Sequence, residues 1–189
     1  MRARAVLDWV LTIAAAIVFV LAFEAEVAKP YRVPTSSMEP TLHCAKPSFG
    51  CRAHVNDRVL VDRLTYRFRS PHRGEIVAFH TPAAARTRCS GAGGVFIKRI
   101  IGLPGERVSE RGGRVFVDGR PLAEPYLRPG ARDSQTAAWP RIPGREYFMM
   151  GDNRTLSCDS RAWGPVPRSS IIGRAILTYW PVTRLSVHG

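Results

Sequence analysis

The sequence predicts a mainly β fold, in which a single N-terminal transmembrane helix precedes an all-β domain of packed, curved antiparallel sheets. Two observations support this prediction. A nearly unbroken apolar run extends from Trp9 to Phe23, whereas the rest of the chain alternates short β-branched and aromatic segments with turns. No long stretch after the run has helical periodicity, so the helix and the β domain are expected to be separate parts.

The apolar run has the length of a membrane anchor. A helix needs roughly 20 apolar residues to cross a bilayer, and residues 6–24, which contain the run, meet that length with little to spare. Arg2 and Arg4 precede the run and place the N-terminus in the cytoplasm by the positive-inside rule. A cleavable secretory signal is the alternative, but Phe23 and Glu26 occupy the −3 positions of its two candidate cleavage sites, where small residues are needed.

Two domains follow from this interpretation. Residues 1–29 are expected to be the cytoplasmic N-terminus and plasma-membrane anchor, and residues 30–189 a monomeric extracytoplasmic β-rich domain. The whole formal net charge of +13 lies on the second part, because acidic and basic residues cancel in the first. The basic residues are scattered and form no nucleic-acid motif. We therefore expect no nucleic-acid partner, and contact with the anionic lipid surface instead.

Six segments after residue 30 read as strands, because they are short and rich in β-branched or aromatic residues. Two other segments, 82–94 and 128–145, are predicted to be irregular loops. The predicted strands are residues 58–64, 74–80, 95–101, 114–119, 146–152 and 173–180.

Four cysteines, Cys44, Cys51, Cys89 and Cys158, suit an oxidising exterior and up to two disulfides. Three pairings are open, and the sequence does not choose among them. Cys44 and Cys51 could close a short loop. The cysteine spacings match no zinc pattern, so we expect neither a metal nor a cofactor.

Lys98 stands out within the apolar segment VFIKRII, because only three of the 28 basic residues are lysines. Side chains alternate along a strand, so Lys98 is expected to share a face with Phe96 and Ile100. Burial there would lower the pKa of the amine, whereas an arginine would stay protonated. Lys98 is therefore a candidate general base. A snorkelling or ion-paired lysine on an edge strand is the structural alternative.

Two further segments could complete a catalytic site. RVPTSSMEPTL, residues 32–42, holds two serines on a turn stiffened by Pro34 and Pro40, and lysine can replace histidine as the base of a serine nucleophile. MMGDNRTLSCDSRAWGPVP, residues 149–167, supplies charged and hydroxyl side chains that could orient the base. The alternatives are a polar surface turn and a salt-bridged β-turn, respectively.

Four blocks together resemble one known family. VPTSSMEPTL, RGEIVAF, FIKRIIGLPGE and GDNRTLSCDSRAWGPVP follow the apolar run in the order found in bacterial type I signal peptidases. The resemblance covers nearly the whole chain apart from the loops. It implies a membrane-bound serine endopeptidase that removes N-terminal signal peptides from exported preproteins. Such an enzyme cuts after small residues at −3 and −1, through a Ser–Lys dyad and an acyl-enzyme intermediate.

The resemblance also implies residue roles. Ser37 matches the nucleophile and Lys98 the general base, while the Ser37 N–H and the Thr35 hydroxyl match the oxyanion hole. Three residues of the last block match supporting positions: a hydroxyl that hydrogen-bonds the lysine, and a carboxylate–guanidinium pair. They are Ser157, Asp159 and Arg161.

Substrate-binding positions follow in the same way. The peptide is implied to lie extended beside the lysine strand and the segment before Ser37. The residues implied to line its shallow apolar pockets are Tyr31, Val33, Pro34, Met38, Leu42, Phe96 and Ile97. The chain departs from the family pattern at Ser36, where many members have glycine, and at Cys158, where alanine is common. The insert at residues 43–51 has no role that the sequence explains.

Two alternatives to this function remain. In a Ser–His–Asp hydrolase, His43 would be the base, but the chain has no G-x-S-x-G nucleophile elbow. An inactive membrane-tethered β domain that binds peptides or lipid would also suit the positive charge. A self-cleaving Ser–Lys repressor is disfavoured, because an anchor precedes the serine and no DNA-binding segment exists.

Overall fold

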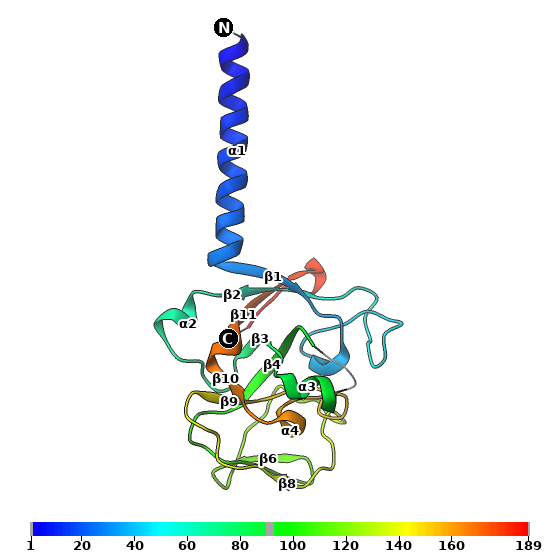
Figure 1. The fold of residues 1–189 in the computed structure, drawn as a ribbon. Helices are drawn as coiled ribbons and strands as arrows, with labels where there is room; N and C mark the ends of the chain where they lie inside the picture. Colours follow the sequence, from blue (N-terminus) through cyan, green and yellow to red (C-terminus); the bar gives the residue numbers. More distant parts are fainter. Residues whose placement is uncertain (1, 90–92, 189) are drawn as a thin grey trace.

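A computed structural model describes residues 2–89 and 93–188, with one helix projecting from a β-rich body (Figure 1). Helix α1 (Arg2–Glu26) extends away from the body and joins its first strand directly. Among the residues that the structure describes, no helix meets the length and hydropathy needed for a membrane span. The predicted parts 1–29 and 30–189 and the predicted loop 82–94 each include residues outside the described ranges.

The larger sheet has eight strands in the order β1-β2-β11-β3-β4-β9-β10, with β12 pairing β11, and every pairing is antiparallel. Its strands are β1 (Ala28–Arg32), β2 (Arg58–Asp62), β3 (Ile76–His80), β4 (Val95–Gly102), β9 (Glu146–Met150), β10 (Val166–Pro167), β11 (Ile171–Trp180) and β12 (Ser186–Val187).

The smaller sheet has four antiparallel strands in the order β7-β6-β5-β8. They are β5 (Val108–Arg111), β6 (Arg114–Val117), β7 (Arg120–Pro121) and β8 (Ala137–Ala138). This sheet lies at the end of the body opposite α1 (Figure 1). The mainly β, antiparallel prediction is therefore confirmed.

Short helices fill the connections: α2 (Thr65–Phe68), α3 (Ala83–Arg88), α4 (Ser160–Trp163), η1 (Ser36–Met38), η2 (Arg168–Ser170) and η3 (Val182–Arg184). All six predicted strands are present, with ends shifted by at most two residues. The predicted loop 82–94 contains α3, and the predicted loop 128–145 contains β8. The strands that the sequence did not reveal are short or polar, so they lack the apolar alternation that marks a strand.

Strand β4 runs through the interior of the larger sheet, between β3 and β9. Its two faces pack into different hydrophobic clusters, as the predicted alternation requires. Phe96 and Ile100 pack in one cluster, and Ile97 packs in another with Val33 and Met38. Lys98 therefore does not lie on an edge strand of the sheet.

The first half of β4 nevertheless has one unpaired side. Val95 to Lys98 pair with β3 along one edge, while pairing with β9 on the other edge begins at Arg99. No described strand pairs with the remaining edge of this segment. The backbone beside Lys98 is thus open for an additional strand.

Two disulfides resolve the pairing that the sequence left open. Cys44 bonds Cys51 with a Cα–Cα distance of 5.0 Å, and Cys89 bonds Cys158 with a Cα–Cα distance of 6.0 Å. The first closes the insert after η1. The second ties the end of α3 to the loop that follows β9.

Candidate active site

Ser37 lies in the middle of η1, and the loop after β9 is hydrogen-bonded to η1 through Asn153. The Asn153 backbone N–H donates to the Ser37 carbonyl at 3.1 Å, and the Asn153 side-chain amide donates to the Ser36 carbonyl at 3.1 Å. A side chain at Gly151 would overlap the Ser37 carbonyl and the Ser157 side chain. The glycine thus allows a close approach of two segments that are far apart in the sequence.

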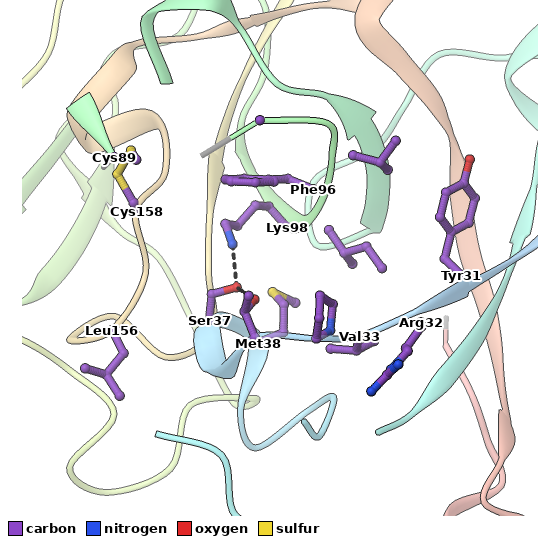
Figure 2. A pocket seen from close by; sticks show the side chains of 15 residues that line it. Tyr31, Arg32, Val33, Ser37, Met38, Cys89, Phe96, Lys98, Leu156 and Cys158 are labelled. Atoms are coloured by element: carbon purple, nitrogen blue, oxygen red, sulfur yellow. Dashed lines mark hydrogen bonds between the residues drawn. A yellow bond between two sulfur atoms is a disulfide. The ribbon is translucent and has the colours of Figure 1, made fainter. Parts of the chain in front are cut away.

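The side chains of Ser37 and Lys98 meet in the centre of the site (Figure 2). The Lys98 Nζ lies 2.5 Å from the Ser37 Oγ, and the Thr35 Oγ1 lies 3.3 Å from the same Oγ. Lys98 is 3% exposed and forms no ion pair with a described carboxylate. The structure thus brings together the three residues that the sequence assigned to the reaction centre.

The environment of Lys98 favours the neutral amine. Burial lowers the pKa of Lys98 to about 8, and the nearby Arg161 charge acts in the same direction. The carboxylates of Asp159 and Asp152 act against this shift, without cancelling it. The Phe96 ring, whose centroid is 5.2 Å from the Nζ, contributes part of the apolar cover. A lysine with such a pKa is neutral in a substantial fraction of molecules near neutral pH.

Asp159 and Arg161 form the predicted pair beside the site. The Arg161 Nε and Nη2 donate to the two Asp159 carboxylate oxygens at 2.8 and 2.9 Å, and the Gly151 N–H donates to Asp159 at 3.0 Å. Burial alone would raise the pKa of Asp159, but the hydrogen bonds and the positive charge of Arg161 outweigh it and lower that pKa. Asp159 is therefore a fixed negative charge near Lys98.

Ser157 differs from its expected role. Its hydroxyl is buried without a hydrogen-bond partner among the described residues, so the expected bond to Lys98 is not formed. Ser157 still lies within the site, because its side chain is next to Gly151, whose N–H donates to Asp159.

A cavity of about 360 Å³ opens over Ser37 and Lys98 (Figure 2). One of the seven expected substrate-contacting residues, Leu42, is fully buried in the core and does not line it. Residues that the sequence did not reveal also line it, namely Arg32, Leu156 and the Cys89–Cys158 disulfide. The expected residues that do line it are Tyr31, Val33, Pro34, Met38, Phe96 and Ile97.

Arg99, the neighbour of Lys98, has a different environment. Its Nε and Nη2 donate to Asp152 at 2.9 and 2.6 Å, and the Thr41 hydroxyl donates to the same carboxylate at 2.5 Å. The sequence reasoning did not pair Arg99 with Asp152. The signal was present in the Lys-Arg dipeptide, because adjacent side chains of a strand point to opposite faces and need separate partners.

His43 does not contact the nucleophile. Its Nδ1 lies 2.6 Å from the Glu39 carboxylate, and no described hydrogen bond joins it to Ser37. The described part of the chain holds no group of three or more side chains suited to a metal ion.

Known proteins have sequences similar to that of this chain. The family described as "Signal peptidase, peptidase S26" matches residues 6–180. The signal peptidase I of Leptolyngbya laminosa is 39% identical over 183 residues, covering 97% of this chain and 84% of the relative. The signal peptidase I of Mycobacterium tuberculosis is 35% identical, covering 85% of this chain and 68% of the relative. A crystal structure of a signal peptidase I from Enterococcus faecalis superimposes with a TM-score of 0.46 at 30% identity, covering 56% of this chain and 97% of that one.

The antiparallel β fold and these relatives define the class of protein as a protease of the signal peptidase type. The chain belongs to the signal peptidase family, peptidase S26, and is a type I signal peptidase, which is a serine protease.

Proposed function

We propose that Ser37 and Lys98 form the catalytic dyad with which this enzyme removes signal peptides from exported preproteins. The observation that carries the proposal is the 2.5 Å contact between the Lys98 Nζ and the Ser37 Oγ, made by a buried lysine with a lowered pKa. A serine hydroxyl is a weak nucleophile until a base takes its proton. The neutral Lys98 amine is the one basic group in hydrogen-bond contact with it among the described residues.

Acylation follows from this geometry. Neutral Lys98 takes the proton of Ser37 while the Oγ attacks the scissile carbonyl carbon. The resulting oxyanion accepts hydrogen bonds from the Ser37 N–H and the Thr35 hydroxyl; one such donor typically contributes about 10²–10³ in rate. Lys98 then gives the proton to the leaving amine, and the N-terminus of the mature protein departs.

Deacylation reuses the same base. After the amine has left, Lys98 is neutral again and takes a proton from water, which attacks the acyl-enzyme ester. The carboxyl end of the signal peptide is released when Lys98 returns the proton to the Ser37 Oγ. Asp159, Arg161 and Ser157 act as positioning residues, because the hydrogen bonds of Arg161 to the other two hold the loop in shape, and because the charges of Asp159 and Arg161 act on Lys98.

The unpaired edge of β4 suggests how the substrate binds. An extended peptide added beside Val95 to Lys98 would receive backbone hydrogen bonds and would pass the Ser37 Oγ. Alternate side chains of such a strand point to the same face, so the −1 and −3 residues would both enter the apolar cavity. The buried walls at Val33, Met38 and Ile97 leave room for small side chains, which favours cleavage after small residues at both positions.

Helix α1 is proposed to anchor the enzyme in the plasma membrane, with residues 30–189 outside the cytoplasm. The side chains along its middle are apolar and exposed, among them Trp9, Ile13 and Val18. Exposed apolar area of this extent needs an apolar environment. Alkaline carbonate extraction of membranes tests the anchor: the full chain is expected to stay in the pellet, and a variant lacking residues 2–26 in the supernatant. Release of the full chain would contradict it.

Cleavage of a purified preprotein by the full-length protein in detergent tests the dyad. The unmutated protein is expected to cut after the small −1 residue. Ser37→Ala and Lys98→Arg are each expected to lower the rate by at least about 10⁴-fold, because each removes the nucleophile or the base. His43→Gln is the matched control and is expected to retain cleavage.

Two results would overturn this assignment. Cleavage that survives Lys98→Arg but is lost in His43→Gln would identify a histidine base. Absence of cleavage by the unmutated, folded protein would favour a peptide-binding module. Circular dichroism of each variant shows that the loss is not caused by unfolding.

A further inference from the structure

A second hollow adjoins the active-site cavity on the far side of the nucleophile. Its volume is about 400 Å³, and its lining is largely polar. Four segments form it: Glu39 with Pro40, the end of the 43–51 insert with Arg52, the stretch 128–131, and the loop 153–156. The proposed reaction does not use any of these side chains.

The two hollows are separated by little more than one side chain. Leu156 lines both of them. Gly50, in the wall of the second hollow, lies directly against Leu156 and the Ser36 side chain, so a β-carbon there would overlap both. Asn153, in the same wall, donates hydrogen bonds to the carbonyls of Ser36 and Ser37. The second hollow is therefore built onto the nucleophile turn itself.

The direction of the substrate chain selects which of its residues reach this hollow. In the proposed binding mode, the residues before the cut occupy the end of the cavity near Tyr31 and Val33. In Figure 2, Leu156 lies on the opposite side of Ser37 from Tyr31 and Arg32. An extended chain advances about 3.3 Å per residue, so the first few residues after the cut pass over Leu156 and leave the cavity on that side.

The charges of the second hollow are unbalanced. Arg52 and Arg128 are exposed, and neither forms an ion pair with a described residue. The carboxylate in the wall, that of Glu39, is 2% exposed. It is already bonded to the His43 ring at 2.6 Å and to the backbone N–H groups of Cys44 and Arg52 at 3.2 and 3.3 Å. The Glu39 carboxylate is thus already hydrogen-bonded, and no ion pair joins it to Arg52 or Arg128, the two arginines that line the hollow.

We propose that this hollow is a subsite for the first residues of the mature protein, and that Arg52 and Arg128 make it selective for acidic side chains there. The proposal rests on the proposed peptidase function of Ser37. A carboxylate of the substrate would supply the counter-charge that the described residues do not provide, and guanidinium groups bind carboxylates through paired hydrogen bonds.

The same arrangement gives the insert a role. The Cys44–Cys51 disulfide closes the loop, and the Arg52 N–H is tied to the buried Glu39. Both constraints fix the backbone from which the Arg52 side chain extends toward the hollow. A short disulfide-closed loop loses less conformational entropy on binding than an open one, so it is suited to presenting a charged side chain.

The experiment measures kcat/KM for a set of preprotein-derived peptides with the full-length enzyme in neutral detergent. The peptides are identical up to the cut and carry Asp, Asn or Lys at each of the first five positions after it. The unmutated enzyme is expected to prefer Asp over Lys by roughly tenfold at one or two of these positions, as exposed charge pairs of this kind permit. High salt should reduce the preference.

Charge-reversal variants locate the preference. Arg52→Glu and Arg128→Glu are expected to lower the Asp-to-Lys ratio by roughly three- to tenfold each, and the pair together to invert it. Cleavage of the Asn peptides should change little, because the dyad is untouched. Arg120→Glu, an exposed arginine on β7 in the smaller sheet, is the matched control with the same change in net charge.

The outcomes separate this inference from the proposed function. If the enzyme cuts the Asp and Lys peptides with equal kcat/KM at every position, the proposed subsite is wrong, whereas the proposed peptidase function still stands. The same is true if Arg120→Glu changes the ratio as much as Arg52→Glu does. If no peptide is cut by the folded, unmutated enzyme, the proposed function itself fails.

Discussion

Lys98 and Arg99 are adjacent cations on the same strand, and both are nearly inaccessible to solvent, yet their surroundings are opposite. Arg99 meets a carboxylate through two hydrogen bonds and a carbonyl through a third, the Gly74 oxygen at 2.7 Å. Lys98 meets one hydroxyl. The difference teaches that burial alone does not define a general base: the group must be buried without a direct counter-charge, so that the neutral form is favoured.

The same contrast extends across the site. Two ion pairs near the site have both partners buried, namely Asp159–Arg161 and Glu124–Arg154. These pairs hold the loop after β9 in place. Lys98 and Glu110 are buried without an ion partner among the described residues. Buried ion pairs thus stabilise the fold, whereas Lys98 and Glu110 can gain or lose a proton near neutral pH.

The largest expected effect comes from replacing each adjacent cation with methionine. Lys98→Met should lower activity by at least about 10⁴-fold but should not lower stability at pH 7, because it removes a buried, unpaired amine. Arg99→Met should cost about 3–5 kcal/mol of unfolding free energy, because it leaves Asp152 buried without its partner. Urea unfolding measures the stability of each variant, and peptide cleavage measures its activity. Equal destabilisation by the two changes would contradict the contrast.

An intermediate effect is expected in the pH dependence. The rate requires neutral Lys98, so it should rise with pH to a plateau with a midpoint near the pKa of about 8. The negative charge of Asp159 opposes the lowering of that pKa, so Asp159→Asn should lower it further. The midpoint should then move to lower pH by up to about one unit, together with a lower plateau.

Asp133→Asn is the matched control for that shift. Asp133 also pairs with Arg161, but it is not among the charges that act on Lys98. Its replacement should leave the midpoint in place. A shift to higher pH in Asp159→Asn, or the same shift in both variants, would show that Asp159 does not set the protonation of Lys98.

The smallest expected effect is on stability alone. Burial raises the pKa of Glu110 to about 7, and the charge of Asp133 adds to the shift. The folded state therefore keeps a proton that the unfolded state has lost above about pH 4.5, so Glu110 makes stability fall as pH rises through 7. Glu110→Gln should remove that fall and stabilise the protein by about 1–3 kcal/mol at pH 8.

Thermal unfolding of Glu110→Gln at pH 5 and pH 8 checks this. The gain should appear only at pH 8, because the carboxyl is protonated in the folded state at pH 5. Glu146→Gln, on a half-exposed position of β9, is the control. A gain of equal size at both pH values would mean that the variant acts through packing rather than through its charge.

Sequence reasoning identified the β-rich class and its six most regular strands. Strands such as β3, with four consecutive buried residues, carry enough apolar signal to be found in one sequence. Strands such as β7 and β8, with two residues each, do not. They exist because longer neighbours offer them hydrogen bonds, and that property is not visible in their own residues.

The same limit applies within the site. Met38 and Ile97 were placed correctly beside the cavity, whereas Leu42 lies wholly in the core beneath it. All three are apolar residues close in sequence to Ser37 or Lys98, and only three-dimensional packing distinguishes a position in the cavity wall from one in the hydrophobic core. The expected bond of Ser157 to Lys98 is absent for a related reason, since the fold of the loop decides whether a hydroxyl reaches its partner.

The sequence by itself determined which residues are proposed for the reaction centre. A rare lysine in an apolar strand, a serine on a proline-bounded turn and the resemblance of four ordered blocks were sufficient to propose Ser37, Lys98 and Thr35. The tertiary structure alone decided their neighbours: the 2.5 Å contact, the unpaired edge of β4, the disulfide pairing and the arginine-lined hollow past Leu156. The physical reason is that residue chemistry is local, whereas burial and electrostatic partners depend on segments far apart in the chain.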